Sequence, residues 1–216
     1  MSKGFLAIIA AVVLIFIGVF AFSGHKSGGD KSSGSSSNTS KATNHVEGKG
    51  QANVTLVEYG DYECPYCEQY YPIVKQVVAK YNDQIKFQFV NFPLVSIHQN
   101  AFAGARAAEA AAAQNKFWQM HDLLYDNQNQ WAQSSSPTKY FKQYAQQLGL
   151  NADKFDKDYS SNAVNDAINA DMAKGNKLNI QGTPTFLLNG KQINVTASAS
   201  SFETQIQQAI NQKKKS

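Results

Sequence analysis

A buried strand that leads into two cysteines at the start of a helix is the feature that most constrains this fold. Residues 53–60, NVTLVEYG, are apolar and β-branched and end on glycine, which indicates a buried strand. Cys64 and Cys67 follow, and a helix is expected to begin near Cys64 because proline at position 65 suits a first helical turn. A second strand is expected at 86–93. Strand, helix and strand within about 40 residues predict a βαβ unit with parallel strands.

The rest of the folded part adds a helical block and a hairpin. Residues from about 99 to 179 are helical in pattern almost throughout, too long a stretch for an ordinary crossover. Two strands joined by an Asn189-Gly190 turn are expected next, followed by an amphipathic helix capped by Ser200 or Ser201. The predicted fold class is therefore α/β with a large helical insertion.

The N-terminal part of the sequence indicates that the protein is exported from the cytoplasm. Residues 5–22 are 18 apolar residues without a charge, about 27 Å of helix, which suits a single transmembrane anchor in residues 1–22. A cleaved signal sequence is the alternative for the same stretch. Residues 23–50 are half serine and glycine, so they are expected to form a flexible tether. Residues 51–216 are then expected to form one domain.

The charge pattern argues against nucleic-acid binding. The chain has a formal net charge of +4. Residues 51–216 contain 15 basic and 14 acidic residues, so most of the excess comes from the segment before them, and three of the 15 are the lysines 213–215 near the C-terminus. No basic face interleaved with aromatic residues is present, so no nucleic-acid partner is expected.

The cysteine pair has three possible uses. A zinc site needs four ligands, and the four histidines lack the usual ligand spacing, so no metal site is expected. A structural disulfide closing so short a loop would restrain the unfolded chain little. Redox exchange is favoured because the pair follows a strand and opens a helix. The exposed amides of a helix start favour a thiolate, so Cys64 is expected to be the exposed, attacking thiol and Cys67 the resolving one.

The charges next to the pair are expected to moderate its reactivity. Asp61, Glu63 and Glu68 are near the two cysteines in sequence, and no basic residue occurs before Lys75. Because carboxylates disfavour a neighbouring thiolate, a moderately activated Cys64 is predicted.

Three other positions are candidates for the site. Glu58 is either an outward-facing acid of the first strand or a buried proton acceptor for Cys67. Thr183-Pro184 precedes a strand, where the proline could simply open an edge strand. A cis bond there would instead free the Thr183 backbone to pair with an extended substrate. His98 is either a solvated loop residue or part of the substrate face.

VTLVEYGDYECPYC, the later GTPTFLLNG and the helical block between them resemble the DsbA-like branch of the thioredoxin superfamily, in particular its membrane-anchored BdbD-type oxidoreductases. The resemblance implies a thioredoxin fold, a nucleophile at Cys64, a resolving thiol at Cys67, a cis-proline at Pro184 and an assisting acid at Glu58. Pro-Tyr between the cysteines is similar to glutaredoxins, whereas strongly oxidising members have Pro-His, so a milder oxidant is expected.

The predicted function is that of an extracytoplasmic, membrane-tethered enzyme that forms disulfides in exported proteins. Its substrates are expected to be unfolded or reduced exported proteins, contacted by four residues: Pro65, Tyr66, Thr183 and His98. No cofactor beyond the Cys64–Cys67 disulfide is expected. Because no second cysteine pair exists, reoxidation is expected to come from a quinone-linked membrane thiol oxidase. A reductase or isomerase of the same fold and a non-enzymatic thioredoxin-fold binding module are the alternatives.

Overall fold

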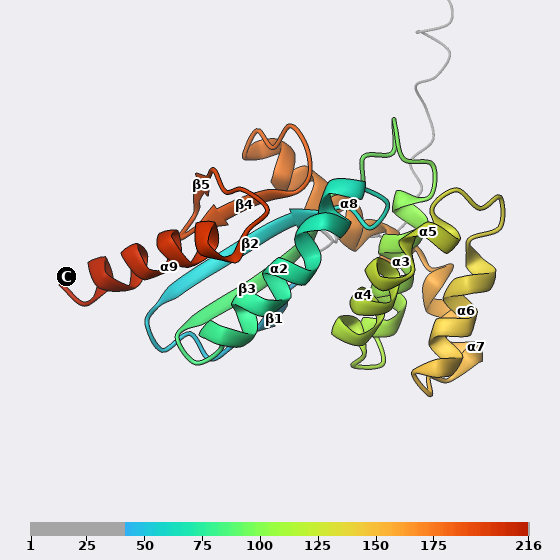
Figure 1. The fold of residues 1–216 in the computed structure, drawn as a ribbon. Coiled ribbons are helices and arrows are strands. Elements are labelled where there is room, and N and C mark those ends of the chain that lie inside the picture. The colour runs from blue at the N-terminus through green and yellow to red at the C-terminus, as the bar shows by residue number, and fades with distance from the viewer. Residues whose placement is uncertain (1–41, 216) are drawn as a thin grey trace, which may run out of the picture. The chain divides into compact units, whose positions relative to one another are not determined.

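The structure is a computed structural model, and it describes residues 42–215 (Figure 1). The expected anchor or signal in residues 1–22 lies outside these residues, as does most of the expected tether. Within residues 42–215, no helix has the length and apolar character needed to cross a membrane.

The described residues contain one mixed sheet of five strands in the order β1-β3-β2-β4-β5. The strands are β1 (His45–Glu47), β2 (Val54–Gly60), β3 (Ile85–Asn91), β4 (Thr185–Leu188) and β5 (Lys191–Ile193). β2 and β3 are parallel, as expected for a βαβ unit, and the other neighbours are antiparallel. The βαβ prediction is therefore confirmed.

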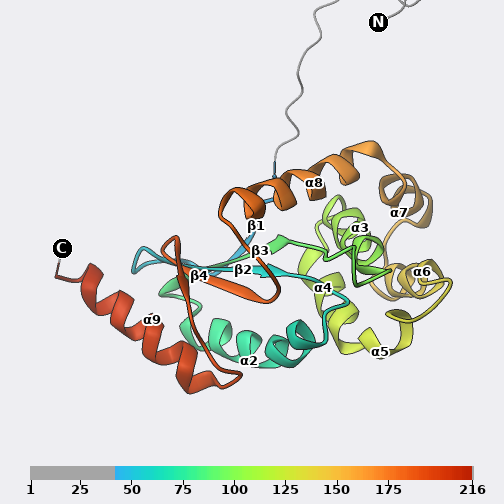
Figure 2. The same cartoon turned by 90° about the horizontal axis from the view of Figure 1, so that it is seen from above.

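Helices cover both faces of the sheet and extend beyond it. α2 (Pro65–Tyr81) and α9 (Ala199–Lys213) lie on one face, and α8 (Asn162–Lys177) lies on the other (Figure 2). Five further helices cluster beside the sheet: α3 (Ala101–Ala112), α4 (Phe117–Asp126), α5 (Gln128–Trp131), α6 (Thr138–Gln147) and α7 (Ala152–Tyr159). Because α3 to α8 all lie between β3 and β4 in the chain, the predicted helical insertion is confirmed.

The predicted hairpin is present, but the cap of the last helix differs from its prediction. Asn189 and Gly190 have φ values of 51° and 80°, the left-handed backbone of the tight turn that joins β4 to β5. The residue before α9 is Ser198, with extended backbone angles, rather than Ser200 or Ser201. Those two serines lie inside the first turn, so the predicted cap is wrong.

The folded domain begins before residue 51, so the predicted boundary of the tether is wrong. His45–Glu47 form β1, which pairs antiparallel with β3. His45 Nε2 lies 2.8 Å from Glu109 Oε1, and its ring stacks on Phe117 with ring centroids 3.5 Å apart. Polar local sequence concealed this strand because the partners that order it lie far along the chain.

The alternation of side chains along β2 directs Glu58 toward α2. Leu56 belongs to the larger hydrophobic cluster, which includes the α2 residues, whereas Tyr59 belongs to the smaller cluster. Residues two apart in a strand share a face, so Glu58 lies on the Leu56 side. Its register partners on the neighbouring strands are Phe89 and Phe186. The acid is therefore enclosed between aromatic neighbours beneath the helix.

Candidate active site

The two cysteines lie where the sequence placed them, at the start of α2. Cys64 is the N-cap residue, Pro65 is the first helical residue, and both thiols are free. Cys64 is only 3% exposed and Cys67 is fully buried, so the prediction that Cys64 is exposed is wrong. The Cys64 thiol donates to the Thr183 carbonyl oxygen at 3.4 Å, which places it beneath the loop before β4.

The environment makes the two thiols chemically unequal. A hydrogen bond with the Cys67 thiol is the main cause that lowers the pKa of Cys64 to about 6, and backbone amides of the helix start contribute. Burial, followed by the hydrogen bond to Cys64 and the nearby Glu58, raises the pKa of Cys67 well above its usual value. At neutral pH the stable form of the reduced pair is a Cys64 thiolate beside a Cys67 thiol. This asymmetry suits attack at Cys64 and resolution by Cys67.

Glu58 is the buried acid of the site. Its side chain is 3% exposed, and no hydrogen-bond partner for Oε1 exists among the described residues. Burial, with a smaller contribution from the Cys64 charge, raises the pKa of Glu58 to about 8. The inward orientation of Glu58 is confirmed, and the acid is protonated at neutral pH. A proton shuttle between Glu58 and Cys67 remains a prediction.

Asp61 and Glu63 hold the loop before α2 in place. Asp61 accepts hydrogen bonds from the backbone amides of Glu63 at 2.8 Å and Leu94 at 2.9 Å, and Glu63 accepts from the backbone amide of Asn100. Both side chains are buried. The expected effect of these acids on the thiol is not seen, because neither is among the causes that set the Cys64 pKa. Their charges are directed toward backbone donors instead.

His98 contacts a buried acid rather than solvent. Its Nδ1 lies 2.7 Å from Asp61 Oδ2, and its side chain is only 15% exposed. It is therefore not a solvated loop residue, and it does not line the groove described next. Its contribution to a substrate face remains a prediction.

A groove lies beside the cysteines on the β4 and β5 side of α2. The Thr183–Pro184 peptide bond is cis, as predicted for a proline that faces the redox pair. Thr183, Pro184 and the exposed Tyr66 line this groove together with Tyr70 and the strand residues that follow. Pro65 is exposed at the adjacent helix start. Two of the four predicted substrate-contacting residues, Tyr66 and Thr183, thus line the groove, and Pro65 precedes Tyr66 in the chain; their role is a prediction.

Comparison with known proteins identifies the family. Residues 40–208 match the family model described as Thioredoxin. This chain belongs to the thioredoxin family. Within curated proteins, 148 residues are 36% identical to part of Na⁺/H⁺ antiporter NhaA 3 of Salinispora tropica, and 150 are 35% identical to part of NhaA 1 of Mycolicibacterium gilvum. These matches cover 68% of this chain but only 22% and 24% of those proteins, so the chain spans about a quarter of their length or less.

Solved structures refine the position of the chain within the thioredoxin family. A thioredoxin-like oxidoreductase from Silicibacter pomeroyi is 26% identical with a TM-score of 0.64, and the match covers 80% of this chain and 93% of that one. Oxidised BdbD from Bacillus subtilis is 25% identical with a TM-score of 0.68 over 77% and 92%. α-DsbA1 from Wolbachia pipientis, 17% identical with a TM-score of 0.70 over 79% and 92%, shares the fold. The chain is thus a thioredoxin-family protein whose structural neighbours include proteins of the DsbA and BdbD type.

Sequence reasoning missed the residues that the helical insertion contributes to this thioredoxin-family site. Gln128 of α5 donates through Nε2 to the carbonyl oxygens of Tyr62 at 2.8 Å and Cys64 at 3.0 Å. Asn100, just before α3, donates to the backbone carbonyls of Ala132 and Ser134. No local pattern marks these amides, because their partners are 32 to 66 residues away. In the described part of the chain, no group of three or more His, Cys, Asp or Glu residues could hold a metal.

Proposed function

We propose that this protein is an oxidase that introduces disulfide bonds into exported proteins through the Cys64–Cys67 pair. The unequal pKa values of the two thiols are the observation that carries the proposal. A Cys64 thiolate that is stable at neutral pH lowers the free energy of the reduced pair, which makes the disulfide a better oxidant. The lowered pKa of about 6 lies between about 3.5 for DsbA and about 7 for thioredoxin. An oxidant of intermediate strength is expected.

The reaction balances as two thiol–disulfide exchanges. A substrate thiolate attacks Cys64 Sγ, the Cys64–Cys67 bond breaks, and the Cys67 thiolate that leaves takes a proton from Glu58. A second substrate thiolate then attacks the substrate sulfur of the mixed disulfide, and Cys64 leaves as a thiolate. The substrate loses two electrons and the cysteine pair gains them. An extended substrate segment would lie in the groove and pair with the backbone of Thr183.

The cellular setting completes the proposal. The apolar segment 5–22 would anchor the protein to a membrane, with the domain outside the cytoplasm, where disulfides persist. The reduced pair would be reoxidised by a membrane thiol oxidase that passes electrons to a quinone, and unfolded exported proteins would be the substrates. Resemblance to BdbD and α-DsbA1 supports an extracytoplasmic setting.

Trapping of intermediates tests the roles of the two cysteines. Cys67→Ser should accumulate mixed disulfides with reduced, unfolded polypeptides, because no resolving thiol remains. Cys64→Ser, the matched control, should accumulate none. Equal trapping by the two variants, measured on non-reducing gels after alkylation, would contradict the assigned roles.

Redox equilibrium with glutathione tests the direction of electron flow. A potential between about −120 mV, as in DsbA, and about −200 mV would support an oxidase. A value near the thioredoxin figure of about −270 mV would instead indicate a reductase. Failure to exchange disulfides with glutathione at all would leave only a binding module of the same fold.

A further inference from the structure

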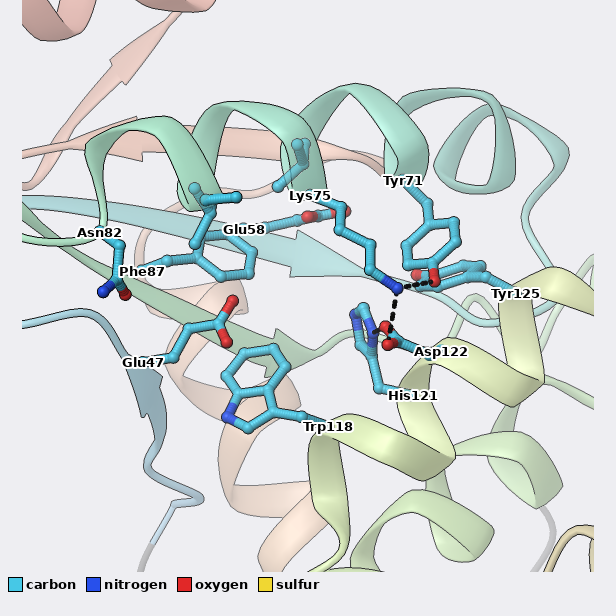
Figure 3. Close-up of a pocket in the computed structure, with 13 residues that line it drawn as sticks. Glu47, Glu58, Tyr71, Lys75, Asn82, Phe87, Trp118, His121, Asp122 and Tyr125 are labelled. Atoms are coloured by element: carbon cyan, nitrogen blue, oxygen red, sulfur yellow. Dashed lines mark hydrogen bonds and ion pairs between the residues drawn. The ribbon is translucent and has the colours of Figure 1, made fainter. Parts of the chain in front are cut away.

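A cavity lies between α2, α4 and the β1–β3 side of the sheet, away from the substrate groove (Figure 3). Its volume is about 230 Å³, and its aromatic walls include Phe87, Trp118 and Tyr125. An apolar protein cavity of about 150 Å³ is large enough to bind benzene. The cavity therefore has room for a somewhat larger aromatic ring system.

His121 of α4 contributes an unsatisfied hydrogen-bond acceptor to the cavity wall. Burial lowers the pKa of His121, so the ring is neutral at pH 7. Its Nδ1 lies 3.4 Å from Asp122 Oδ1, and a nitrogen that faces a carboxylate carries the hydrogen, so the hydrogen is assigned to Nδ1. Nε2 is then an acceptor, and it has no partner among the described residues. The side chain is buried, so a molecule in the cavity is the available source of a donor.

Glu58 contributes the second unsatisfied polar atom of the wall. Its Oε1 lacks a partner within the described part of the chain. Burial raises the pKa of Glu58 to about 8, so the carboxyl brings no charge to the cavity at neutral pH. A pure hydrocarbon in this space would leave both polar atoms without partners, which costs free energy. The walls thus favour an aromatic molecule that also carries a polar group.

The rim of the cavity disfavours anions and is open to solvent. Asp122 and Glu47 both line the cavity, and Lys75 Nζ already contacts Asp122 Oδ2 at 2.8 Å, as Figure 3 shows. Two carboxyl groups beside one ammonium group would repel a carboxylate ligand. Ala79 and Asn82, which also line the cavity, are exposed on and just after α2. An uncharged molecule can therefore enter from this side.

Helix α2 separates this cavity from the substrate groove. Tyr70 lines the groove and donates to the Val195 carbonyl oxygen, whereas its neighbour Tyr71 lines the cavity. The two sets of lining residues have no member in common. A molecule in the cavity and a polypeptide in the groove would therefore not compete for the same space.

We propose that the cavity is a binding site for a small uncharged aromatic molecule that carries an N–H or O–H donor, such as an indole or a phenol. The ring would lie among Phe87, Trp118 and Tyr125, and its donor would bind His121 Nε2. The site goes beyond the proposed oxidase function, and neither one requires the other.

Two ligands that differ in their hydrogen-bond donor test the proposal. Indole and 1-methylindole are titrated into the wild-type protein at pH 7 and followed by calorimetry. Indole should bind with a dissociation constant of about 0.1 to 1 mM, which is reasonable for a ligand of so few atoms. 1-Methylindole should bind about tenfold more weakly, because it brings no donor for His121 Nε2. His121→Phe keeps an aromatic ring but removes the acceptor, so this variant should bind the two ligands equally.

Variants on the two sides of α2 locate the bound molecule. Val78 lines the cavity at 5% exposure, and Val78→Phe should abolish indole binding by filling the space. Ala79→Trp should weaken binding by covering the rim from the exposed side of α2. Two controls should keep the wild-type affinity for indole: Gln76→Trp, exposed on the same helix outside the cavity lining, and Tyr66→Ala in the groove.

Three results would overturn the proposal. If indole does not bind the wild-type protein, the cavity holds water alone. If Val78→Phe and Ala79→Trp both bind indole as the wild type does, the ligand lies elsewhere, and Ala79→Trp decides alone if Val78→Phe does not fold. If the wild type binds indole and 1-methylindole equally, His121 does not select a donor.

Discussion

Glu58 and Asp61 are both buried carboxyl groups close to the cysteines, yet their surroundings differ completely. Asp61 accepts hydrogen bonds from two backbone amides and contacts the His98 ring. Glu58 lies between Phe89 and Phe186, and its Oε1 lacks a partner within the described residues. Burial without donors raises the pKa of Glu58 to about 8. The hydrogen-bond donors thus give Asp61 a structural role. Glu58, whose Oε1 lacks such a donor among the described residues, holds a proton instead.

The same comparison predicts how substitution of each acid changes stability. A buried carboxyl without donors costs free energy whenever the pH favours its ionised form in the unfolded chain. A buried carboxylate that accepts hydrogen bonds stabilises the folded protein through those bonds. Substitution should therefore change stability in opposite directions at the two positions.

The largest effect is expected for Glu58→Gln. Because the pKa of Glu58 is raised from 4.5 to about 8, the wild-type free energy of unfolding falls as pH rises from about 4.5 to 8. Glutamine removes this titration, so the variant should be more stable by about 4 kcal/mol at pH 8 and nearly unchanged at pH 4. Denaturant unfolding at the two pH values measures this. An equal gain at both would contradict the assignment.

Asp61→Ala should destabilise the protein by about 3 kcal/mol, because two backbone amides lose a charged acceptor. Asp61→Asn retains one acceptor oxygen and serves as the matched variant, with a smaller loss. The free energy of unfolding at pH 7, measured on the same curves, decides between them. A loss below about 1 kcal/mol for Asp61→Ala would show that the loop before α2 is held by other contacts.

The smallest effect is expected for His98→Ala, which removes one contact with Asp61 and leaves its two amide partners in place. A loss of about 1 to 2 kcal/mol in the free energy of unfolding is expected. Rates of disulfide exchange with glutathione should stay within about twofold, since the ring does not line the groove. A large drop in that rate with unchanged stability would restore His98 to the substrate face.

Most of the fold could be predicted from the sequence because its signals are local. The apolar run 53–60, Pro65 at the helix start and the Asn189-Gly190 turn each specify an element within a few residues. The strand β1 could not be predicted, because only Val46 is apolar in His45–Glu47 and its pairing depends on β3.

The site could be predicted only where its signals are also local in the sequence. Cys64, Cys67, Glu58 and Pro184 follow from a motif and from strand alternation, so their positions were accessible. The structural role of Asp61 could not be predicted, because the Leu94 amide that donates to it lies 33 residues further along the chain. The cavity was also missed, since it joins α2 residues such as Lys75 to Asp122 of α4, 47 residues further on.

The contact of Thr43 with Asp171 bears on how a pull on the chain would enter the domain. Thr43 donates through its backbone amide and its hydroxyl to the Asp171 carboxylate, which also accepts from the Asn91 amide at the end of β3. The next residues form β1 at the edge of the sheet. A pull applied to the chain before Thr43 would therefore act first on α8 and the end of β3, through Asp171. The contacts that hold the start of the described chain are thus made by other elements than the redox helix α2.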